Sequence, residues 1–444
     1  MGTFFGTDGI RGVAGTPPLD PPTVARIAAA IVRSLGLNRP ARLIVGRDTR
    51  ESGEWIEREL ARGAASQSAT VVTAGVVPTP VVAYLARTLD FDLGIVISAS
   101  HNPYRDNGIK VFSGRGEKFG ELEERKVEAL IADAGWHVSG QAEAKLERAD
   151  LLAPYFEHTA PLLPTIGHLR GSRIGIDMAN GATTATAPRM LEDAGLELVT
   201  LGNAPDGRNI NMACGSTHPA ALATAVVEQR CRLGVAFDGD GDRAILVDHR
   251  GRVIDGYAVL LMLALHYKRQ ERLPLDTVVA TVMSNIGLEI ALRNHGIRLV
   301  RTPVGDKHVM DEMLRNGYVL GGEQSGHVIL SEHLFTGDGL ATTLAVLRTM
   351  VESERELADL AGELETYPQT LVNVRVREKH PVENVPAVAA AMRRVEAALG
   401  GHGRLLVRYS GTEPLLRIMI EGQNQATVQA WAEEIADAVR NTLA

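Results

Sequence analysis

The chain has 444 residues, and 46 basic against 54 acidic side chains leave a formal net charge of −8. This length exceeds one hydrophobic core and predicts about three or four domains. An acidic balance without a basic run argues against a nucleic-acid partner. The two cysteines, Cys214 and Cys231, fit no metal or redox spacing and indicate a reducing compartment. The start lacks the basic residues of a signal peptide, and the longest apolar helical run, residues 258–265, is too short to span a bilayer, so we predict a soluble, cytoplasmic protein.

Strands alternate with amphipathic helices through most of the chain. We expect strands at residues 42–45, 173–177, 277–283 and 298–302, and helices at residues 54–67, 185–194 and 286–295. Such alternation predicts α/β layers, and three recurring units of strand, polar loop and helix indicate repeated α/β domains. The end of the chain differs, because strands are expected at 371–376, 404–408 and 415–420 with helices at 386–399 and 427–443. This order predicts a small α+β domain.

A serine lies in a polar loop directly after a buried strand. Residues 93–97 are apolar throughout and predict the strand, and Ser100 and His101 follow it before Pro103 ends any regular structure. Functional groups tend to lie on such loops, held by a rigid scaffold. A plain turn with a capping serine is the alternative interpretation.

Three aspartates at alternate positions follow a second buried strand, residues 233–237. The side chains of Asp238, Asp240 and Asp242 repel one another unless a cation lies between them. Intervening glycines, Gly239 and Gly241, are expected to let the backbone take left-handed turns. Hard oxygen ligands in this number favour Mg²⁺ over a solvated acidic turn.

Two other interpretations of these residues are excluded. A calcium loop of the EF-hand type requires Gly and Glu where this chain has Arg243 and His249. A dinucleotide fingerprint requires a helix where residues 244–247 predict a strand.

Two further loops carry polar groups suited to a phosphorylated sugar. Residues 321–327 bring together Glu323, Gln324, Ser325 and His327, which suit sugar hydroxyls, and the imidazole could move a proton. In residues 408–417, two arginines bracket a Ser-Gly-Thr turn, which suits a phosphate, although a plain hairpin is the alternative. An acidic chain that binds phosphate must place its cations locally, and the candidates are Arg11, Lys110, Arg243, Arg408 and Arg417.

These motifs together resemble the α-D-phosphohexomutase family, and among its members the bacterial enzymes that act on glucosamine phosphates. In chain order they are FGTDGIRG (5–12), GRDTR (46–50), PTP (78–80), ISASHNP (97–103), NGIK (107–110), DGDGDR (238–243), VGD (304–306), GGEQSGH (321–327), TGDG (336–339) and RYSGTEP (408–414). The sequence departs from the usual pattern at Lys307 and Tyr409.

The resemblance implies three similar α/β domains with mixed sheets and a smaller C-terminal α+β domain around a central cleft. Their expected bounds are 1–150 with the phosphoserine loop, 151–252 with the metal loop, 253–367 with the sugar-binding loop, and 368–444 with the phosphate-binding loop. It also implies an intramolecular phosphotransferase that interconverts glucosamine 6-phosphate and glucosamine 1-phosphate and so feeds UDP-N-acetylglucosamine and cell-wall synthesis. Glucosamine 1,6-bisphosphate would be the intermediate or activator, with a homodimer as a possible assembly and no membrane partner.

Site roles are likewise carried over by resemblance. Ser100 would be the phosphoserine, and one Mg²⁺ per chain would be held by Ser100, Asp238, Asp240 and Asp242. The other catalytic residues would be His101, Lys110, Arg11, Arg243 and His327, with Lys110 ranked before His101 and His327 as general base. Substrate-binding residues would be Glu323, Ser325, Arg408, Ser410, Gly411, Thr412 and Arg417.

Other functions stay open from the sequence. Within the family, the alternative is a phosphomannomutase/phosphoglucomutase. An aspartyl-phosphate phosphatase with Asp238 as its nucleophile, and a non-catalytic sugar-phosphate binding protein, are alternatives from other classes. A serine hydrolase is disfavoured because neither Ser100 nor Ser325 lies in a G-x-S-x-G elbow.

Overall fold

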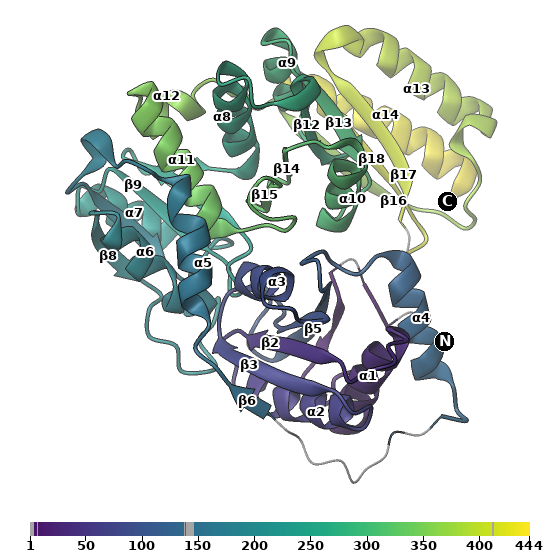
Figure 1. Ribbon diagram of the computed structural model, residues 1–444. Coiled ribbons are helices and arrows are strands. Elements are labelled where there is room, and N and C mark those ends of the chain that lie inside the picture. Colours follow the sequence, from purple (N-terminus) through teal and green to yellow (C-terminus); the bar gives the residue numbers. More distant parts are fainter. Residues whose placement is uncertain (1–3, 7, 137, 139–145, 411–412) are drawn as a thin grey trace. The chain divides into compact units, whose positions relative to one another are not determined.

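The structure, a computed structural model, describes residues 4–6, 8–136, 138, 146–410 and 413–444 (Figure 1). The chain forms two compact units. The first contains Met1–Val282 and Val300–Gly362, and the second contains Met283–Leu299 and Glu363–Ala444. No helix among the described residues is long and apolar enough to cross a bilayer.

The first sheet has six strands in the order β1-β5-β4-β2-β3-β6. Its strands are β1 (Ile10–Val13), β2 (Arg42–Arg47), β3 (Thr70–Val76), β4 (Leu93–Ile97), β5 (Asp106–Ser113) and β6 (Leu146–Arg148). The helices of this part of the chain are α1 (Pro21–Ser34), α2 (Gly53–Ala65), α3 (Thr79–Thr88) and α4 (Glu121–Ala132).

The second sheet has the order β11-β10-β9-β7-β8, and the third has the order β13-β12-β14-β15. The second is built from β7 (Arg173–Asp177), β8 (Glu197–Leu201), β9 (Leu233–Phe237), β10 (Ala244–Asp248) and β11 (Val253–Ile254), with α5 (Leu152–Thr159), α6 (Ala187–Asp193) and α7 (Ala220–Glu228). The third is built from β12 (Thr277–Thr281), β13 (Arg298–Thr302), β14 (Leu320–Gly322) and β15 (Val328–Leu330). The helices that follow α7 up to the last sheet are α8 (Gly256–Arg269), α9 (Ile286–Asn294), α10 (Asp306–Asn316), α11 (Gly339–Ser353) and α12 (Leu357–Ala361).

The last sheet is antiparallel and has the order β16-β18-β17. It consists of β16 (Gln369–Arg375), β17 (Arg404–Tyr409) and β18 (Leu415–Glu421), with α13 (Pro386–Leu399) and α14 (Gln425–Leu443). Helix α9 belongs to the same compact unit, where the Glu421 carboxylate accepts a hydrogen bond of 3.0 Å from the Ile286 N–H at the start of the helix. The predicted fold class is confirmed, with three mixed α/β sheets and a small α+β domain.

The first three sheets share one arrangement, and this arrangement places the candidate loops. In each, two parallel strands lie side by side, and the second of them turns back into an antiparallel hairpin: β2, β4 and β5; β7, β9 and β10; β12, β14 and β15. The three hairpin loops are the segments that carry Ser100, the three aspartates and Glu323. The same structural position in each sheet therefore presents a different chemistry.

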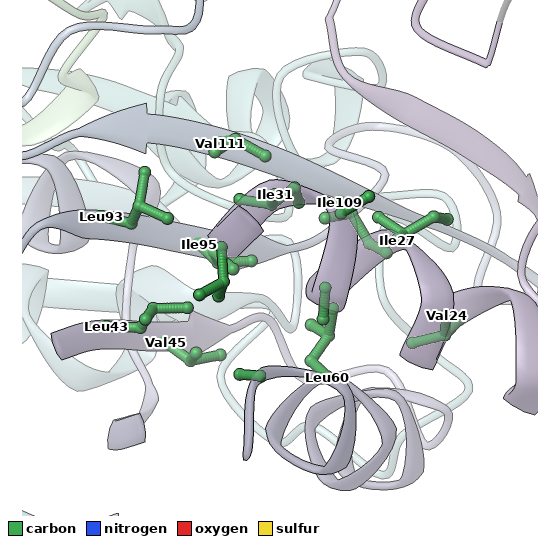
Figure 2. Packing of buried hydrophobic residues seen from close by; sticks show 14 of the residues in the cluster. Val24, Ile27, Ile31, Leu43, Val45, Leu60, Leu93, Ile95, Ile109 and Val111 are labelled. Atoms are coloured by element: carbon green, nitrogen blue, oxygen red, sulfur yellow. The ribbon is translucent and has the colours of Figure 1, made fainter. Parts of the chain in front are cut away.

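The core of the first sheet holds the strands that carry these loops. Apolar side chains of α1 at helical spacing, such as Val24, Ile27 and Ile31, pack on alternate residues of the strands, such as Leu43 and Val45 (Figure 2). Helix α3 covers the opposite face, where a Cβ at strand residues 46 or 94 would meet the Val82 side chain. Each fully buried Val, Leu or Ile contributes roughly 1.5–3 kcal/mol, so the strand that ends before Ser100 is firmly held on both faces.

Element boundaries differ from the sequence prediction by a few residues. The helix predicted at 185–194 is a short 3₁₀ turn, Ala182–Ala185, followed by α6 from Ala187. Pro188 lies in the first turn of α6, where a missing N–H costs no hydrogen bond. The strand predicted at 277–283 ends at Thr281, and residues 321 and 322, predicted as loop, form the end of β14.

Candidate active site

Ser100 is fully buried in the loop after β4, against the loop of the second sheet. Its hydroxyl donates a short hydrogen bond to Oδ2 of Asp238 and lies 3.2 Å from Nδ1 of His101. Its backbone has φ = 53°, a left-handed conformation that costs a non-glycine residue about 1–3 kcal/mol unless the surroundings enforce it. Ser98 contributes to that enforcement, because its Oγ accepts the Ser100 N–H at 2.9 Å. The structure thus brings together the nucleophile and the metal loop that the sequence predicted.

Two residues without a predicted role, Asp48 and Arg50, hold this serine loop through hydrogen bonds. Both are buried, and Arg50 Nε donates to Asp48 Oδ2 at 2.8 Å. The guanidinium donates to the backbone carbonyls of Ser100 (3.0 Å), Asn102 (2.8 Å), Asp106 (3.0 Å) and Pro103. Asp48 also accepts the Ser98 hydroxyl at 2.6 Å, and burial raises the pKa of Asp48 despite the charge of Arg50. The sequence signal was the GRDTR motif, which fixes no role by itself.

The three aspartates lie between β9 and β10 and are all buried. One carboxylate oxygen from each lies within 4.8 Å of the others, and Oδ1 of Asp240 and Oδ1 of Asp242 have no hydrogen-bond partner. Burial, followed by repulsion from Asp242 and Asp240, raises the pKa of Asp238 well above its ordinary value. Buried carboxylate oxygens without partners are costly, and a hard divalent cation would satisfy them. The residues therefore fit a metal ion.

The two glycines of the metal loop are required for different structural reasons. Gly241 has φ = 71°, as the sequence predicted. Gly239 does not take a left-handed conformation, so that part of the prediction is wrong. A Cβ on Gly239 would lie 2.5 Å from the Ser100 carbonyl oxygen, so the residue must be glycine to let the two loops approach.

Lys110, on β5, is buried among carboxylates. Its Nζ lies 2.8 Å from Asp240 Oδ2, 3.0 Å from Asp242 Oδ2 and 3.0 Å from Asp8 Oδ2. Burial alone would lower the pKa of Lys110, but the charges of these three carboxylates outweigh it and raise the pKa well above the ordinary value. Thr79 Oγ1 donates to the same Asp240 oxygen at 2.5 Å. In this arrangement Lys110 is an ammonium that neutralises the metal loop.

Lys110 is part of a closed ring of side chains with alternating charges, which we call the charge ring. Successive contacts join Lys110 to Asp8 (3.0 Å), Asp8 to Lys118 (2.7 Å), Lys118 to Asp306, Asp306 to His327 (3.3 Å), His327 to Asp242 (3.6 Å) and Asp242 to Lys110 (3.0 Å). Burial would lower the pKa of His327, but Asp242 and Asp306 outweigh it and raise the pKa. Asp8, Lys118 and Asp306 were not predicted as site residues. Asp8 and Asp306 lie in recognised motifs, but Lys118 does not.

The remaining predicted catalytic side chains face the serine loop. Arg243 Nη1 lies 3.2 Å from His101 Nδ1, and the Arg243 backbone N–H donates to Asp238 Oδ1 at 3.2 Å. Arg11 donates to Asp8 at 2.5 Å and to the Ala99 carbonyl at 3.5 Å. Burial, together with the charges of Arg243 and Arg11, lowers the pKa of His101. Two guanidinium groups thus lie beside the loop of Ser100, the predicted nucleophile.

The third hairpin loop carries a hydroxyl group without a partner. Ser325 Oγ is buried and makes no hydrogen bond. The loop backbone is closed by the Glu323 N–H, which donates to the His327 carbonyl at 2.9 Å, and by the Gly326 N–H, which donates to the Glu323 carbonyl at 3.2 Å. A buried hydroxyl in a fixed loop is suited to a polar ligand, so this loop can serve as a sugar contact.

The second unit contains the predicted phosphate loop, a hairpin of β17 and β18. Arg408 and Arg417 are directly opposite each other on the two strands, so their like charges lie on one face, and Arg417 Nε is buried without a partner. Lys379 adds a third cation, with Nζ 2.6 Å from the Ser410 carbonyl. Like charges in direct opposition are destabilising, and the exposed Glu413 carboxylate, 3.5 Å from Arg417 Nη2, offsets part of this repulsion. Gly411 and Thr412, also predicted here, lie outside the described residues.

Comparisons with known proteins agree with this geometry. Four family models described as phosphoglucomutase/phosphomannomutase match the chain: α/β/α domains I, II and III at residues 2–137, 153–251 and 255–367, and the C-terminal domain at 371–438. The phosphoglucosamine mutase of Solibacter usitatus is 48% identical over 444 residues, and that of Desulfovibrio desulfuricans 44% over 445, each match covering 99% of both chains. A phosphoglucomutase/phosphomannomutase family protein of Burkholderia thailandensis has the same fold, with a TM-score of 0.81 at 24% identity over 99% of this chain and 97% of its own.

The resemblance seen in the sequence motifs is therefore confirmed. With relatives this similar over their full length and all four domain models matched, the chain belongs to the phosphoglucomutase/phosphomannomutase family, the α-D-phosphohexomutases, and is an intramolecular phosphotransferase.

Proposed function

We propose that this enzyme interconverts glucosamine 6-phosphate and glucosamine 1-phosphate, and so feeds UDP-N-acetylglucosamine and cell-wall synthesis. The amino sugar is supported by full-length relatives at 48% and 44% identity that are phosphoglucosamine mutases. The observation that carries the chemistry is the contact of the buried Ser100 hydroxyl with Asp238, beside carboxylate oxygens that have no hydrogen-bond partner. A nucleophile held there would receive and return a phosphoryl group.

The cycle begins with Ser100 phosphorylated. The 1-hydroxyl of glucosamine 6-phosphate attacks the phosphorus, the bond from phosphorus to Ser100 Oγ breaks, and a general base takes the hydroxyl proton and returns it to that oxygen. The product, glucosamine 1,6-bisphosphate, reorients, and Ser100 Oγ attacks the phosphorus at the 6-position. The bond from that phosphorus to the sugar O6 breaks, O6 gains the proton that Ser100 loses, and glucosamine 1-phosphate leaves the phosphorylated enzyme. The bisphosphate is the intermediate, and it also acts as activator when it reloads an enzyme that has lost its phosphate.

Charge neutralisation and positioning supply most of the rate in such a transfer. One Mg²⁺ per chain, held by Asp238, Asp240, Asp242 and an oxygen of the phosphorylated Ser100, would neutralise charge on the transferring group. Arg11 and Arg243, beside the serine loop, hold the phosphoryl oxygens. Lys110 balances the carboxylates that remain.

The proton acceptor for the attacking hydroxyl is one of the three residues named from the sequence. His101 presents Nδ1 3.2 Å from Ser100 Oγ. Lys110 and His327 are instead paired with carboxylates of the charge ring. Lys110, ranked first from the sequence, must lose its proton to act as the base. Its pairing with three carboxylates therefore favours His101.

Substrate binding uses the other two loops. Glu323 and the unpartnered hydroxyl of Ser325 contact the sugar. The second phosphate is held by Arg408, Ser410, Gly411, Thr412 and Arg417, and the opposed arginines on β17 and β18 support this assignment. One such site can grip either phosphate of the intermediate, which the two half-reactions require.

The test compares turnover of glucosamine, glucose and mannose 6-phosphates by the purified enzyme, together with mass spectrometry of its phosphopeptides. We expect the highest kcat/KM on the amino sugar and phosphate on Ser100. Preference for glucose or mannose phosphate would indicate a phosphoglucomutase/phosphomannomutase. Phosphate on Asp238, or steady release of inorganic phosphate, would instead indicate a phosphatase.

The remaining expectations belong to the same proposal. The division into domains at residues 150, 252 and 367 is supported by family models at 2–137, 153–251, 255–367 and 371–438. A cytoplasmic location and a homodimer complete it, and light scattering on the purified enzyme measures the assembly.

A further inference from the structure

Asn211 contacts the nucleophile loop from a different part of the chain and has no role in the function described so far. It is 8% exposed and lies in the loop between β8 and α7 of the second sheet. Its side-chain Nδ2 donates to the Ser100 carbonyl at 2.9 Å and to the Asn102 carbonyl at 3.1 Å. Because both partners are carbonyl oxygens, only the NH₂ end of the amide can face them, and the chemistry fixes its orientation.

The loop that carries Asn211 is itself firmly anchored. The Asn211 N–H donates to the Ala179 carbonyl at 2.9 Å, and the buried carboxylate of Asp177 accepts from the N–H groups of Ala179 (2.9 Å) and Gly215 (2.7 Å). Earlier in the same loop, the Gly207 carbonyl accepts the Glu51 N–H at 2.9 Å. The backbone of Asn211 is therefore held in place, so its side-chain amide can fix the position of the serine loop.

Three segments meet at the Ser100 carbonyl. Arg50 donates to this oxygen at 3.0 Å and Asn211 donates to it at 2.9 Å, so both lone pairs of the carbonyl oxygen are used. Gly239 of the metal loop packs on the same point, because a Cβ there would lie 2.5 Å from the Ser100 oxygen and 3.0 Å from Asn211 Nδ2. The left-handed conformation that turns the Ser100 hydroxyl toward Asp238 is thus enforced from both sheets.

We propose that Asn211 is a positioning residue for phosphoryl transfer. Its amide fixes the backbone of the nucleophile relative to the metal loop, so that Ser100 Oγ keeps its place opposite Asp238 through both half-reactions. A displacement of about 1 Å at a reacting atom can cost about 100-fold in rate, so two hydrogen bonds to this backbone have a large effect. The inference rests on the proposed function, because it takes Ser100 as the residue that carries the phosphoryl group.

Two substitutions test the side-chain amide of Asn211 without straining its left-handed backbone. Asn211→Asp keeps the shape and tolerates the left-handed φ of 58°, but places a carboxylate oxygen against two carbonyl oxygens. Asn211→Gly deletes the amide, and glycine adopts this φ without strain. Asn203→Asp is the matched control, since Asn203 is exposed in the same loop and its amide donates only to Thr200 Oγ1, at 3.0 Å.

We expect kcat to fall roughly 10- to 100-fold in Asn211→Gly and further in Asn211→Asp, with KM for the sugar phosphate within about twofold of the parent, because no substrate contact is removed. Asn203→Asp should keep both constants. Mass spectrometry should show a lower fraction of phosphorylated Ser100 in both Asn211 variants, because a misplaced phosphoserine is loaded less efficiently. Thermal unfolding checks that each variant is folded. If Asn211→Asp does not fold, Asn211→Gly alone tests the inference.

Two outcomes overturn the inference. One is kcat and Ser100 phosphorylation within about twofold of the parent in a folded Asn211→Gly. The other is a rise in KM at constant kcat, which would make Asn211 a substrate contact. If the parent enzyme prefers glucose or mannose phosphate, the same comparison is made on that substrate. A parent enzyme that turns over sugar phosphates without ever carrying phosphate on Ser100 would overturn the proposed function, and the inference with it.

Discussion

The molecule contains two regions that we assign to phosphate, and they are built in different ways. In the first unit, Ser100 and the three aspartates are buried, and the atoms without a hydrogen-bond partner are of both kinds: carboxylate oxygens of Asp240 and Asp242, and Nε of Arg11 and Arg243. In the second unit, the hairpin carries Arg408 opposite Arg417, whose side chain is 34% exposed, and the group left over is a guanidinium nitrogen. The first region therefore offers oxygens to a cation and guanidinium nitrogens to an anion, whereas the arginines of the second offer groups to an anion only.

This difference separates two tasks. A buried hydrogen-bond network fixes geometry, which the transferring phosphoryl group requires. A half-exposed pair of cations on a hairpin recognises charge with less demand on geometry, which suits a site that must accept either phosphate of a bisphosphate. Substitutions in the first region should therefore act on the rate or on the metal, and those in the second on the substrate concentration required.

The largest effect is expected from Ser100→Ala. Removal of the nucleophile should lower mutase turnover at least about 10³-fold, because the phosphoserine cannot form. A coupled assay for glucosamine 1-phosphate measures this, and thermal unfolding should show a folded protein. Ser34→Ala is the control, since its hydroxyl donates only to the Ile31 carbonyl at the end of α1. Residual turnover within tenfold of the parent would place the nucleophile elsewhere.

Removal of one metal ligand should act on cation binding before anything else. Asp240→Asn should weaken Mg²⁺ binding at least about tenfold, because one of three anionic ligands is lost. Isothermal titration with Mg²⁺ measures this on the unphosphorylated enzyme, and chelation of the metal should abolish turnover in the parent. The exposed Asp193→Asn is the control. Equal affinity in Asp240→Asn and the parent would contradict the metal site.

In the second region, Arg417→Met should raise KM for the sugar phosphate about 10- to 100-fold, since a hydrogen bond to a charged group contributes roughly 1.5–3 kcal/mol. Mg²⁺ affinity should stay at the parent value, because the substitution leaves the metal loop intact. Steady-state kinetics and titration together test this separation. Arg440→Met, on α14 of the same unit, should change neither. An Arg417 variant with parental KM would mean that the phosphate binds elsewhere.

The smallest effect concerns the stability of the hairpin itself. Arg408 and Arg417 repel each other, and the exposed Glu413 carboxylate, 3.5 Å from Arg417 Nη2, offsets only part of this repulsion. Because an exposed ion pair contributes roughly 0–1 kcal/mol, Arg417→Met should leave the phosphate-free enzyme within about 1 kcal/mol of the stability of the parent. Inorganic phosphate should then raise the unfolding temperature of the parent more than that of the variant. Differential scanning calorimetry with and without phosphate makes this measurement. Clear destabilisation of the phosphate-free variant would show that Arg417 mainly serves packing.

Much of the framework could be predicted from local patterns. The strands before Ser100 and before Asp238, β4 and β9, have the predicted bounds, because a run of five apolar residues buried on both faces is a short-range signal. Helix α13 begins at Pro386 as expected, since proline suits a first helical turn. The polar residues that follow these strands were therefore expected in loops, and the alternate aspartates indicated a cation site without knowledge of the fold.

What the sequence determined by itself was the order of the strands and loops and the chemical type of each loop. Tertiary structure decided which residues hold these loops: Arg50 and Asn211 reach the Ser100 carbonyl from 50 and 111 residues away, and Lys118 reaches Asp306 across 188 residues. It also decided the reason for Gly239, which is a close approach rather than a left-handed turn. The physical cause is that apolar periodicity depends on neighbours within one element, whereas these contacts depend on which strands pair within a sheet and on how separate sheets pack, which no local pattern encodes.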